Sequence, residues 1–283
     1  MRIDAHQHFW RYDPAEYPWI GADWPLRRDF LPKDLQPELA ACKLDGCVAV
    51  QARQTLAESR WLLELAEQHD FIQGVVGWVD LRSTGLESQL REFVPHPKFV
   101  GVRHVVQDEP DDNFMLGTEF QRGIAALEDF GLTYDLLVFP RQLPAANQLA
   151  RNFPRQPLVL DHIAKPPIAR RLQPSQPEFI EWSTQIRRLA ECENVFCKLS
   201  GMVTEADWHN WEAADFEPYL RLVVQAFGPE RLMYGSDWPV ALLAGSYARV
   251  YVLTHDYVAG LGEQAEKKVF GENTMRFYGL ERS

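Results

Sequence analysis

Short apolar or β-branched runs alternate with longer segments of helical period along the chain. The longer segments carry apolar residues at intervals of three and four, which is the pattern of amphipathic helices. Strands that alternate with helices pair in parallel, and eight such units close into a (β/α)8 TIM barrel. The eight runs predicted as strands span residues 2–6, 47–52, 72–80, 99–105, 132–139, 157–162, 194–200 and 231–237, and the clearest helical segments span residues 58–68, 120–130, 179–192 and 216–227.

A chain of 283 residues is long enough for one such barrel, so we expect a single domain over residues 1–283. The alternative is an open, doubly wound parallel sheet. That fold normally carries a glycine-rich phosphate-binding turn after its first strand. At that place this chain has the sequence HQHFW, which favours the barrel.

The long segment between the first predicted strand and a helix expected near residue 33 has little periodicity. Loops of this length are usually lids, binding loops or disordered segments. Its aromatic residues argue against disorder, because aromatics are depleted from disordered chains. We expect an ordered flap over the mouth of the barrel, and the alternative is a segment packed on the barrel flank. The aromatic residues of this loop include Trp10, Tyr12, Tyr17, Trp19 and Trp24.

The formal net charge of −11 argues against nucleic acid and anionic membranes as partners and favours a small-molecule ligand. No apolar run reaches the length of a membrane span, and no targeting segment is apparent, so we expect a cytoplasmic protein. The sequence does not predict an oligomeric state. The cysteines are spaced too widely for a zinc ribbon, so we expect free thiols at Cys42, Cys47, Cys192 and Cys197.

Polar residues gather where the predicted strands end, which is the end of a barrel that carries catalytic groups. His6 and His8 close the first strand and, being two positions apart, point to the same side of it. With His162 after the sixth strand and Asp237 after the eighth, they form a ligand set suited to Zn²⁺ that leaves one position for water. The structural alternatives are polar strand ends for the pair, a hydrogen-bonded core residue for His162 and a turn-forming residue for Asp237.

Asp237 is also predicted to act as general base, because a carboxylate placed after the last strand can take a proton from water. Arg103, at the end of the fourth strand, is expected to bind substrate oxygens through its paired donors. Neighbouring residues of a strand face opposite sides, so His104 enters the same pocket only if the strand ends before it. The other predicted substrate contacts are Arg53, His104, Lys165 and Trp238.

The blocks that carry these residues resemble the amidohydrolase superfamily, and within it the amidohydrolase-2 branch that includes sugar-acid lactonases. The resemblance spans nearly the whole chain and is closest to lactonases of the L-fucono- and L-rhamnono-lactone type. It implies that the paired histidines of the family are His6 and His8, its sixth-strand histidine is His162 and its eighth-strand aspartate is Asp237. The matching blocks, in order, are IDAHQHFW, GVRHVVQDEPD, VLDHIAKP, YGSDWP and GENTMRFYGL.

Two positions depart from the two-metal pattern of the superfamily. The fourth strand offers Arg103 and His104 where that pattern has a bridging lysine or glutamate, and the fifth offers Asp135 where it has a ligand histidine. We therefore expect at most a single divalent ion, such as Zn²⁺. The alternative implied by some relatives is a metal-independent site, in which arginine and histidine polarise the carbonyl group.

Together these features predict a hydrolase that opens a sugar-acid lactone, such as L-fucono-1,5-lactone or a similar deoxy-sugar aldonolactone, to the aldonate. Asp237 would activate water, while His6, His8, His162 and Arg103 would stabilise the oxyanion. The chain has no G-x-S-x-G element, which argues against a serine nucleophile. The alternatives are a metal-dependent non-oxidative decarboxylase of an aromatic or unsaturated acid and a non-catalytic ligand-binding barrel.

Overall fold

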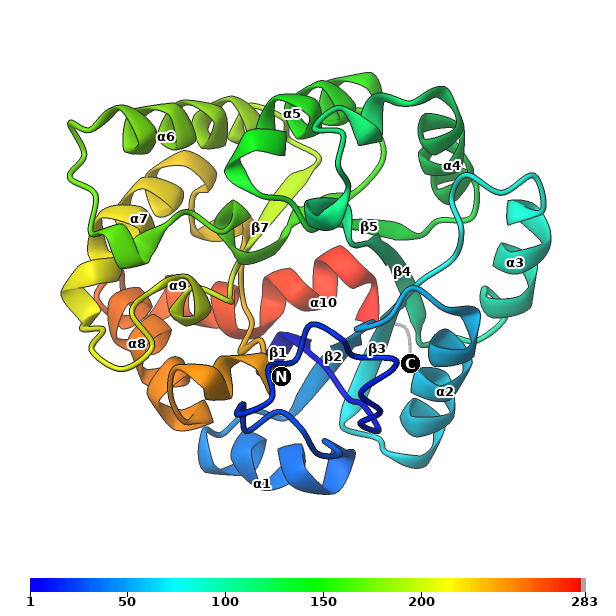
Figure 1. Cartoon of the computed structure of the whole chain (residues 1–283), viewed down its shortest axis with the longest axis horizontal. Helices are drawn as coiled ribbons and strands as arrows, with labels where there is room; N and C mark the ends of the chain where they lie inside the picture. Colours follow the sequence, from blue (N-terminus) through cyan, green and yellow to red (C-terminus); the bar gives the residue numbers. More distant parts are fainter. Residues whose placement is uncertain (281–283) are drawn as a thin grey trace.

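The computed structural model describes residues 1–280, and its strands form one parallel sheet in the order β1 to β8. Figure 1 shows the strands at the centre of the molecule with the helices around them. Each strand lies at one of the runs predicted from the sequence. The bounds are β1 (Ile3–Gln7), β2 (Gly46–Val50), β3 (Ile72–Gly77), β4 (Phe99–His104), β5 (Thr133–Leu136), β6 (Leu158–Leu160), β7 (Val195–Leu199) and β8 (Leu232–Tyr234).

A helix follows each strand, and the four helical segments chosen from the sequence correspond to α2, α4, α6 and α7. Polar caps and prolines define several of the starts: the Thr55 hydroxyl accepts from the backbone N–H of Glu58 at the start of α2, and Pro177 occupies the first position of α6. The bounds are α1 (Pro32–Ala41), α2 (Leu56–Gln68), α3 (Leu86–Phe93), α4 (Thr118–Asp129), α5 (Leu143–Asn152), α6 (Pro177–Ala190), α7 (Ala213–Phe227), α8 (Tyr247–Ala259), α9 (Glu263–Lys267) and α10 (Asn273–Tyr278).

The sheet closes between its first and last strands. Gln7 forms an isolated parallel bridge with Trp238, the N–H of His8 donates to the carbonyl of Trp238 at 2.7 Å, and the N–H of Asp237 donates to the carbonyl of His6 at 2.8 Å. An open sheet would leave these edges apart, so the (β/α)8 barrel is confirmed.

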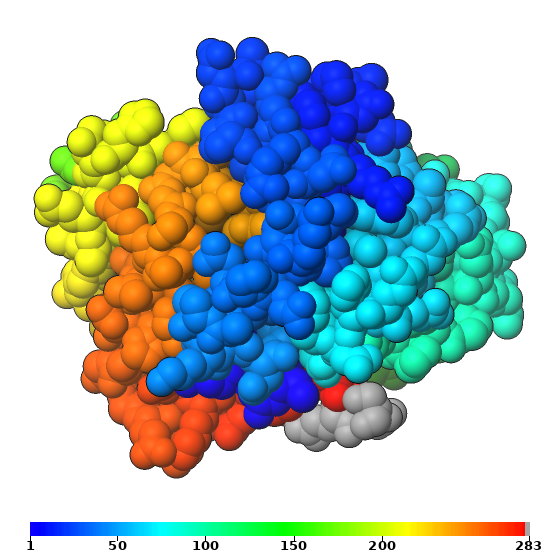
Figure 2. All heavy atoms as spheres, turned by 90° about the horizontal axis from the view of Figure 1, so that it is seen from below, coloured from blue at the N-terminus to red at the C-terminus, as the bar shows by residue number. Residues whose placement is uncertain are grey.

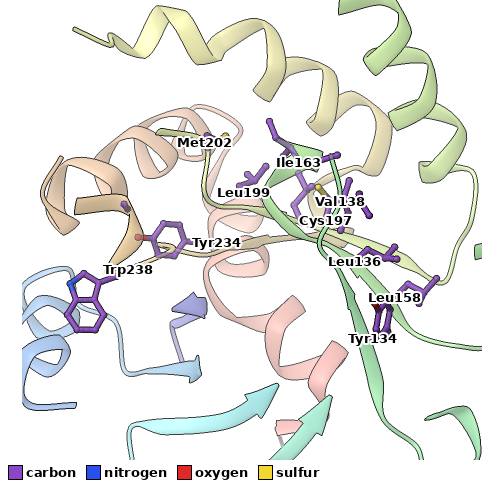
Figure 3. Close-up of a cluster of buried hydrophobic side chains, with 14 of the residues drawn as sticks. Tyr134, Leu136, Val138, Leu158, Ile163, Cys197, Leu199, Met202, Tyr234 and Trp238 are labelled. Atoms are coloured by element: carbon purple, nitrogen blue, oxygen red, sulfur yellow. The ribbon is translucent and has the colours of Figure 1, made fainter. Parts of the chain in front are cut away.

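Alternation along the strands divides the buried side chains into two layers. On β7, Cys197 and Leu199 point outward into the large apolar layer beneath the helices (Figure 3), whereas Lys198 between them points into the barrel. Hydrophobic burial in this outer layer holds the helices against the strands.

A smaller apolar layer fills the barrel interior near the amino ends of the strands. It includes Ile3, Val48, Val159 and Met233 and is completed by Phe277 of α10. In Figure 1, α10 crosses behind the strands, where it closes this end of the barrel. Polar groups inside the barrel therefore face only the opposite end, where the strands terminate.

Residues 9–31 form the ordered flap that the sequence predicts. Trp10 and Phe30 pair as a short antiparallel bridge with backbone hydrogen bonds of 2.9 and 3.0 Å, and Trp10 and Tyr17 are fully buried. In Figure 2 the blue residues of this segment project at one end of the molecule, and the orange-red final helices lie at the other. The flap thus covers the end where the strands terminate.

Two further expectations concern composition. Cys42, Cys47, Cys192 and Cys197 are all free thiols, as predicted. Within residues 1–280, none of the helices has both the length and the apolar character that a bilayer span requires.

Candidate active site

A cavity of about 700 Å³ opens at the carboxyl ends of the strands, beneath the flap. Six predicted site residues line it: His8, Arg53, Arg103, His162, Lys165 and Asp237. The flap contributes Trp10, Glu16, Trp19 and Trp24, and the segment after β7 contributes Trp208. A second hollow, of about 610 Å³, lies on the outer flank against α7 and α8, away from the strand ends. The cavity at the mouth therefore carries the candidate chemistry.

A bulge in β1 turns His6 into the barrel. The pairing of β1 with β2 shifts register between Asp4 and Gln7. Asp4 accepts from Tyr247 of α8 at 2.8 Å, whereas the His6 ring lies 3.1 Å from Lys198 inside the barrel. Regular alternation would have placed both side chains on one face, so the bulge re-aims the histidine. The Asp4 carboxylate also accepts the backbone N–H of His6 at 3.1 Å, which stabilises the bulge.

The Oδ1 atom of Asp237 is the common neighbour of three imidazoles. It lies 3.3 Å from Nε2 of His8, 3.8 Å from Nε2 of His6 and 3.8 Å from Nε2 of His162. Asp237 adopts a left-handed backbone conformation, with φ at 56°. This backbone conformation is strained for a non-glycine residue, so the closure between β1 and β8 must hold Asp237 in it.

The contacts made by Nδ1 of His8 and of His6 fix how the Nε2 atom of each ring is oriented in the site. Nδ1 of His8 lies 2.8 Å from the carbonyl of Val50, to which it donates, so neutral His8 turns an unprotonated Nε2 toward Asp237. Nδ1 of His6 lies 3.1 Å from the Lys198 ammonium and 3.2 Å from Oδ1 of Asp161, and its Nε2 faces Nε2 of His8 at 3.2 Å. Two imidazole Nε2 atoms and a carboxylate oxygen thus converge.

This donor set fits a divalent ion. Nε2 of His6 and Nε2 of His8 are 3.2 Å apart, and the distances to Asp237 are 3.3 and 3.8 Å. Donors about 2 Å from a tetrahedral Zn²⁺ lie roughly 3.3 Å from one another. The structure brings His6, His8 and Asp237 together as one such group.

His162 stands apart from that group. Its donor atoms cluster instead with those of His6 and Asp161, and its Nδ1 lies 2.9 Å from the Ser200 hydroxyl. The structure therefore brings the four predicted ligands close together, with His162 grouped with His6 and Asp161 rather than with His8. His162 begins a run of left-handed residues that ends at Lys165, with φ values between 49° and 60°. Such a run after β6 marks strained backbone at the site.

Arg103 bridges the cavity and a buried ionic network. Its Nη1 donates to Oδ2 of Asp161 at 3.0 Å and lies 3.3 Å from Nε2 of His6. Beneath it, Lys198 lies 3.0 Å from Asp161 and 2.5 Å from Asp135, and the Tyr278 hydroxyl donates to Asp135 at 3.0 Å. These groups form a fully buried floor that orients both Arg103 and His6.

Burial and charge together set the protonation of the site. Burial lowers the pKa of His6 well below its usual value and that of His162 to about 4, so both rings are neutral near pH 7. Burial acts to raise the pKa of Asp237, but the neighbouring His162 and His8 side chains outweigh it and lower the pKa overall. Asp237 is therefore an ionised carboxylate beside neutral imidazoles.

The four remaining predicted contacts divide into two pairs. Arg53 and Lys165 line the cavity. His104 does not, because β4 continues through it and alternation turns its ring outward, where Nε2 lies 2.7 Å from Glu109. Trp238 (Figure 3) does not line the cavity either: its ring is buried, and it packs edge-on against Phe30. The expectation that His104 and Trp238 contact substrate is therefore not supported.

Several residues of the site were not among the predicted site residues. Lys198 ends an apolar run, and a buried lysine there needs an ionic partner. Asp135 and Asp161 are its partners. Glu16 and Glu205 lie in irregular segments with no local pattern, so only the fold places them at the cavity.

The fold and the site define a (β/α)8-barrel enzyme with a histidine–aspartate centre at the carboxyl ends of its strands. The chain belongs to the amidohydrolase family, whose family model matches residues 3–280. It is 43% identical over 287 residues to the L-fucono-1,5-lactonase of Burkholderia multivorans. The alignment covers 99% of this chain and 96% of that protein.

Two further relatives point the same way. An L-fucono-1,5-lactonase of Burkholderia ambifaria is 39% identical over 294 residues, covering 100% of this chain and 97% of that one. A crystal structure of an amidohydrolase from B. multivorans with bound zinc is 42% identical and superposes with a TM-score of 0.93 over 99% of both chains. The predicted family is confirmed.

Proposed function

We propose that the protein hydrolyses sugar-acid lactones to aldonates, with L-fucono-1,5-lactone or a similar deoxy-sugar aldonolactone as substrate. The likeness to two L-fucono-1,5-lactonases supports this substrate class. The observation that carries the mechanism is the convergence of three imidazole Nε2 atoms within 3.8 Å of one carboxylate oxygen of Asp237. Asp237 is ionised near pH 7, so its carboxylate is in the form that can accept a proton from water.

A single Zn²⁺ would be held by His6, His8 and Asp237, whose donor atoms form one group. The zinc-bound relative supports this choice of metal. When bound, such an ion polarises a carbonyl group and lowers the pKa of water. In this arrangement His162 is not a ligand and remains available to the substrate.

Asp237 accepts a proton as water attacks the lactone carbonyl, and the acyl carbon becomes tetrahedral with an oxyanion. Arg103 supplies a fixed positive charge at this place. His162, neutral and hydrogen-bonded at Nδ1 by Ser200, donates from Nε2 to the oxyanion. Each such donor is worth ~3 kcal/mol in comparable sites. Asp237 then returns its proton to the ring oxygen as the acyl–oxygen bond breaks, which yields a hydroxyl group and a carboxylic acid that ionises to the carboxylate and releases one proton.

Outside the centre, we propose that Arg53 and Lys165 contact the substrate hydroxyl groups from the cavity wall. We also propose a single-domain, cytoplasmic protein whose partner is this small molecule rather than nucleic acid or membrane. Four free thiols suit a reducing compartment, and the charge of −11 opposes binding to polyanions.

A panel of sugar lactones, with turnover followed by proton release to a pH indicator, tests the function. We expect hydrolysis of deoxy-sugar aldonolactones, loss of activity in chelator-treated enzyme and its recovery with Zn²⁺. Full activity after complete zinc removal would contradict the metal assignment. Absence of turnover on every lactone would contradict the function itself.

A further inference from the structure

Each lysine or arginine that lines the cavity, within residues 1–280, is already paired with a carboxylate. Arg53 forms an ion pair with Glu16 of the flap, and its Nε also lies 3.5 Å from the buried Glu58, which does not line the cavity. Lys165 lies 3.5 Å from Glu205, and its Nζ donates to the side-chain carbonyl of Gln107 at 3.1 Å. The third cation, Arg103, is held by Asp161 as described above.

Outside the histidine–aspartate centre, the balance of charge on the cavity wall is acidic. The two cations Arg53 and Lys165 face the cavity there, together with the three carboxylates Glu16, Asp108 and Glu205. A substrate that carries its own carboxylate would find no unpaired lysine or arginine and would approach like charges. A neutral polyhydroxy lactone meets no such penalty, because hydroxyl groups bond equally to donors and acceptors.

The Arg53–Glu16 and Lys165–Glu205 pairs lie outside the histidine–aspartate centre. Glu16 comes from the flap and Glu205 from the turn Val203–Glu205 after β7. The side chains of Arg53, Lys165 and Glu205 are exposed by 20, 17 and 21%, so these charges are partly shielded from water, whereas that of Glu16 is exposed by 51%. Charges in such surroundings interact with an effective dielectric constant well below that of water.

We propose that Glu16 and Glu205 are specificity-determining residues that restrict this site to uncharged lactones. Each neutralises one cation of the cavity wall and repels a carboxylate at the ligand position beside it. This inference rests on the proposed lactone hydrolysis and narrows its substrate class. Specificity of this kind depends on a repulsive element built against the wrong ligand.

The same device acts on the product. Hydrolysis converts the neutral lactone into an aldonate with one carboxylate, one hydroxyl group and one released proton. The aldonate then faces the same acidic wall that excludes charged lactones. We therefore expect the product to bind more weakly than the substrate.

The test uses two ligands that differ only in their terminal group. One is an aldono-1,4-lactone, and the other is the aldaro-1,4-lactone in which the terminal CH₂OH is replaced by a carboxylate. Dissociation constants by calorimetry and kcat/KM are measured for wild type, Glu16→Gln, Glu205→Gln and the double variant. The preference of each protein for the neutral ligand is a ratio, so general damage to the flap cancels. Glu92→Gln, which breaks the surface pair with Arg60, is the matched control.

We expect wild type and Glu92→Gln to prefer the neutral lactone more than tenfold. Each pocket substitution should reduce that preference about tenfold, and the inhibition constant of the aldonate product should fall in parallel. An unchanged ratio in the double variant, or equal use of both lactones by wild type, would overturn the inference alone. Failure of wild type to bind or hydrolyse the neutral lactone would overturn the proposed function as well.

Discussion

Nε2 of His8 lies 3.3 Å from Oδ1 of Asp237, although 229 residues separate them in the chain. The contact exists because β1 and β8 meet, with His8 donating its N–H to Trp238 at 2.7 Å. The contact between β1 and β8 that closes the barrel is thus also the contact that assembles the candidate centre. Damage to the closure would remove the site, whereas side-chain substitutions within it need not unfold the protein.

Asp237→Asn tests the proposed base. The amide cannot accept the proton from water, so we expect kcat to fall by ~10² or more. The thermal midpoint should remain within a few degrees of wild type, because the amide occupies the same volume. Proton release measures turnover, and circular dichroism checks the fold. A variant with activity within about tenfold of wild type would show that another group is the base.

His8→Gln and His162→Gln test whether His8 is a zinc ligand and whether His162 acts on the substrate instead. His8 belongs to the group of donor atoms formed with His6 and Asp237, whereas His162 does not. We expect His8→Gln to lower zinc affinity by 10-fold or more, and His162→Gln to retain zinc while kcat falls. Zinc content after dialysis, measured by mass spectrometry, gives the result. Loss of zinc from both variants would make His162 a ligand.

The fold was predictable because the sequence pattern that indicates it is repeated along the whole chain. Each strand run and each amphipathic helix repeats the same alternation, so an error of one or two residues at one end does not change the architecture. The strand predicted over residues 231–237 ends at Tyr234, although the N–H groups of Gly235 and Asp237 still donate to Leu199 of β7 and His6 of β1. Those last contacts belong to the closure between β8 and β1, which local sequence does not encode.

The site was predictable only where residues stand at strand ends. His6, His8, His162 and Asp237 were found by that rule. The orientation of His104 was open because it depends on where β4 ends, and the burial of Trp238 depends on Phe30, which lies in the flap. The Glu16 and Glu205 pairs join segments with no periodicity to residues far away in sequence, so no local pattern reveals them.

Lys198→Met tests the buried network beneath the site. The substitution leaves the carboxylates of Asp135 and Asp161 without their shared cation in a fully buried place. Breaking such a pair typically costs ~3–5 kcal/mol, so we expect the free energy of unfolding in urea to fall by that amount. Lys268→Met, which removes an exposed pair with Glu230, should cost less than ~1 kcal/mol. Equal losses in the two variants would contradict the network.

Glu58→Gln tests a buried carboxyl group beneath the cavity wall. Burial raises the pKa of Glu58 from 4.5 to about 7, while hydrogen bonds from the backbone and the side chain of Arg53 oppose the rise. Folding thus favours the protonated form. The stability that this provides is complete below pH 4.5 and is lost as the pH rises toward 7, because the unfolded chain releases its proton first.

Glutamine is neutral at every pH, so the variant lacks this dependence. We expect the free energy of unfolding of Glu58→Gln, relative to wild type, to increase by about 3 kcal/mol between pH 4.5 and pH 7. Urea titrations at several pH values measure the difference. Glu87→Gln, at an exposed i,i+4 pair with Arg91, is the control and should show little change. A constant difference across the range would contradict the raised pKa.

Gly201→Ala tests the position of His162. Gly201 has a positive φ of 57°, and a Cβ atom there would lie 2.3 Å from Nδ1 of His162. Gly131 has a similar φ of 69° but no atom within 4 Å of a built Cβ, so Gly131→Ala carries the backbone strain alone. Both substitutions should lower stability by ~1 kcal/mol through that strain. Only Gly201→Ala should displace the imidazole, and we expect its kcat to fall at least tenfold while Gly131→Ala keeps wild-type turnover. Because the two share the strain and differ in the clash, equal activity in both would show that the oxyanion does not depend on His162.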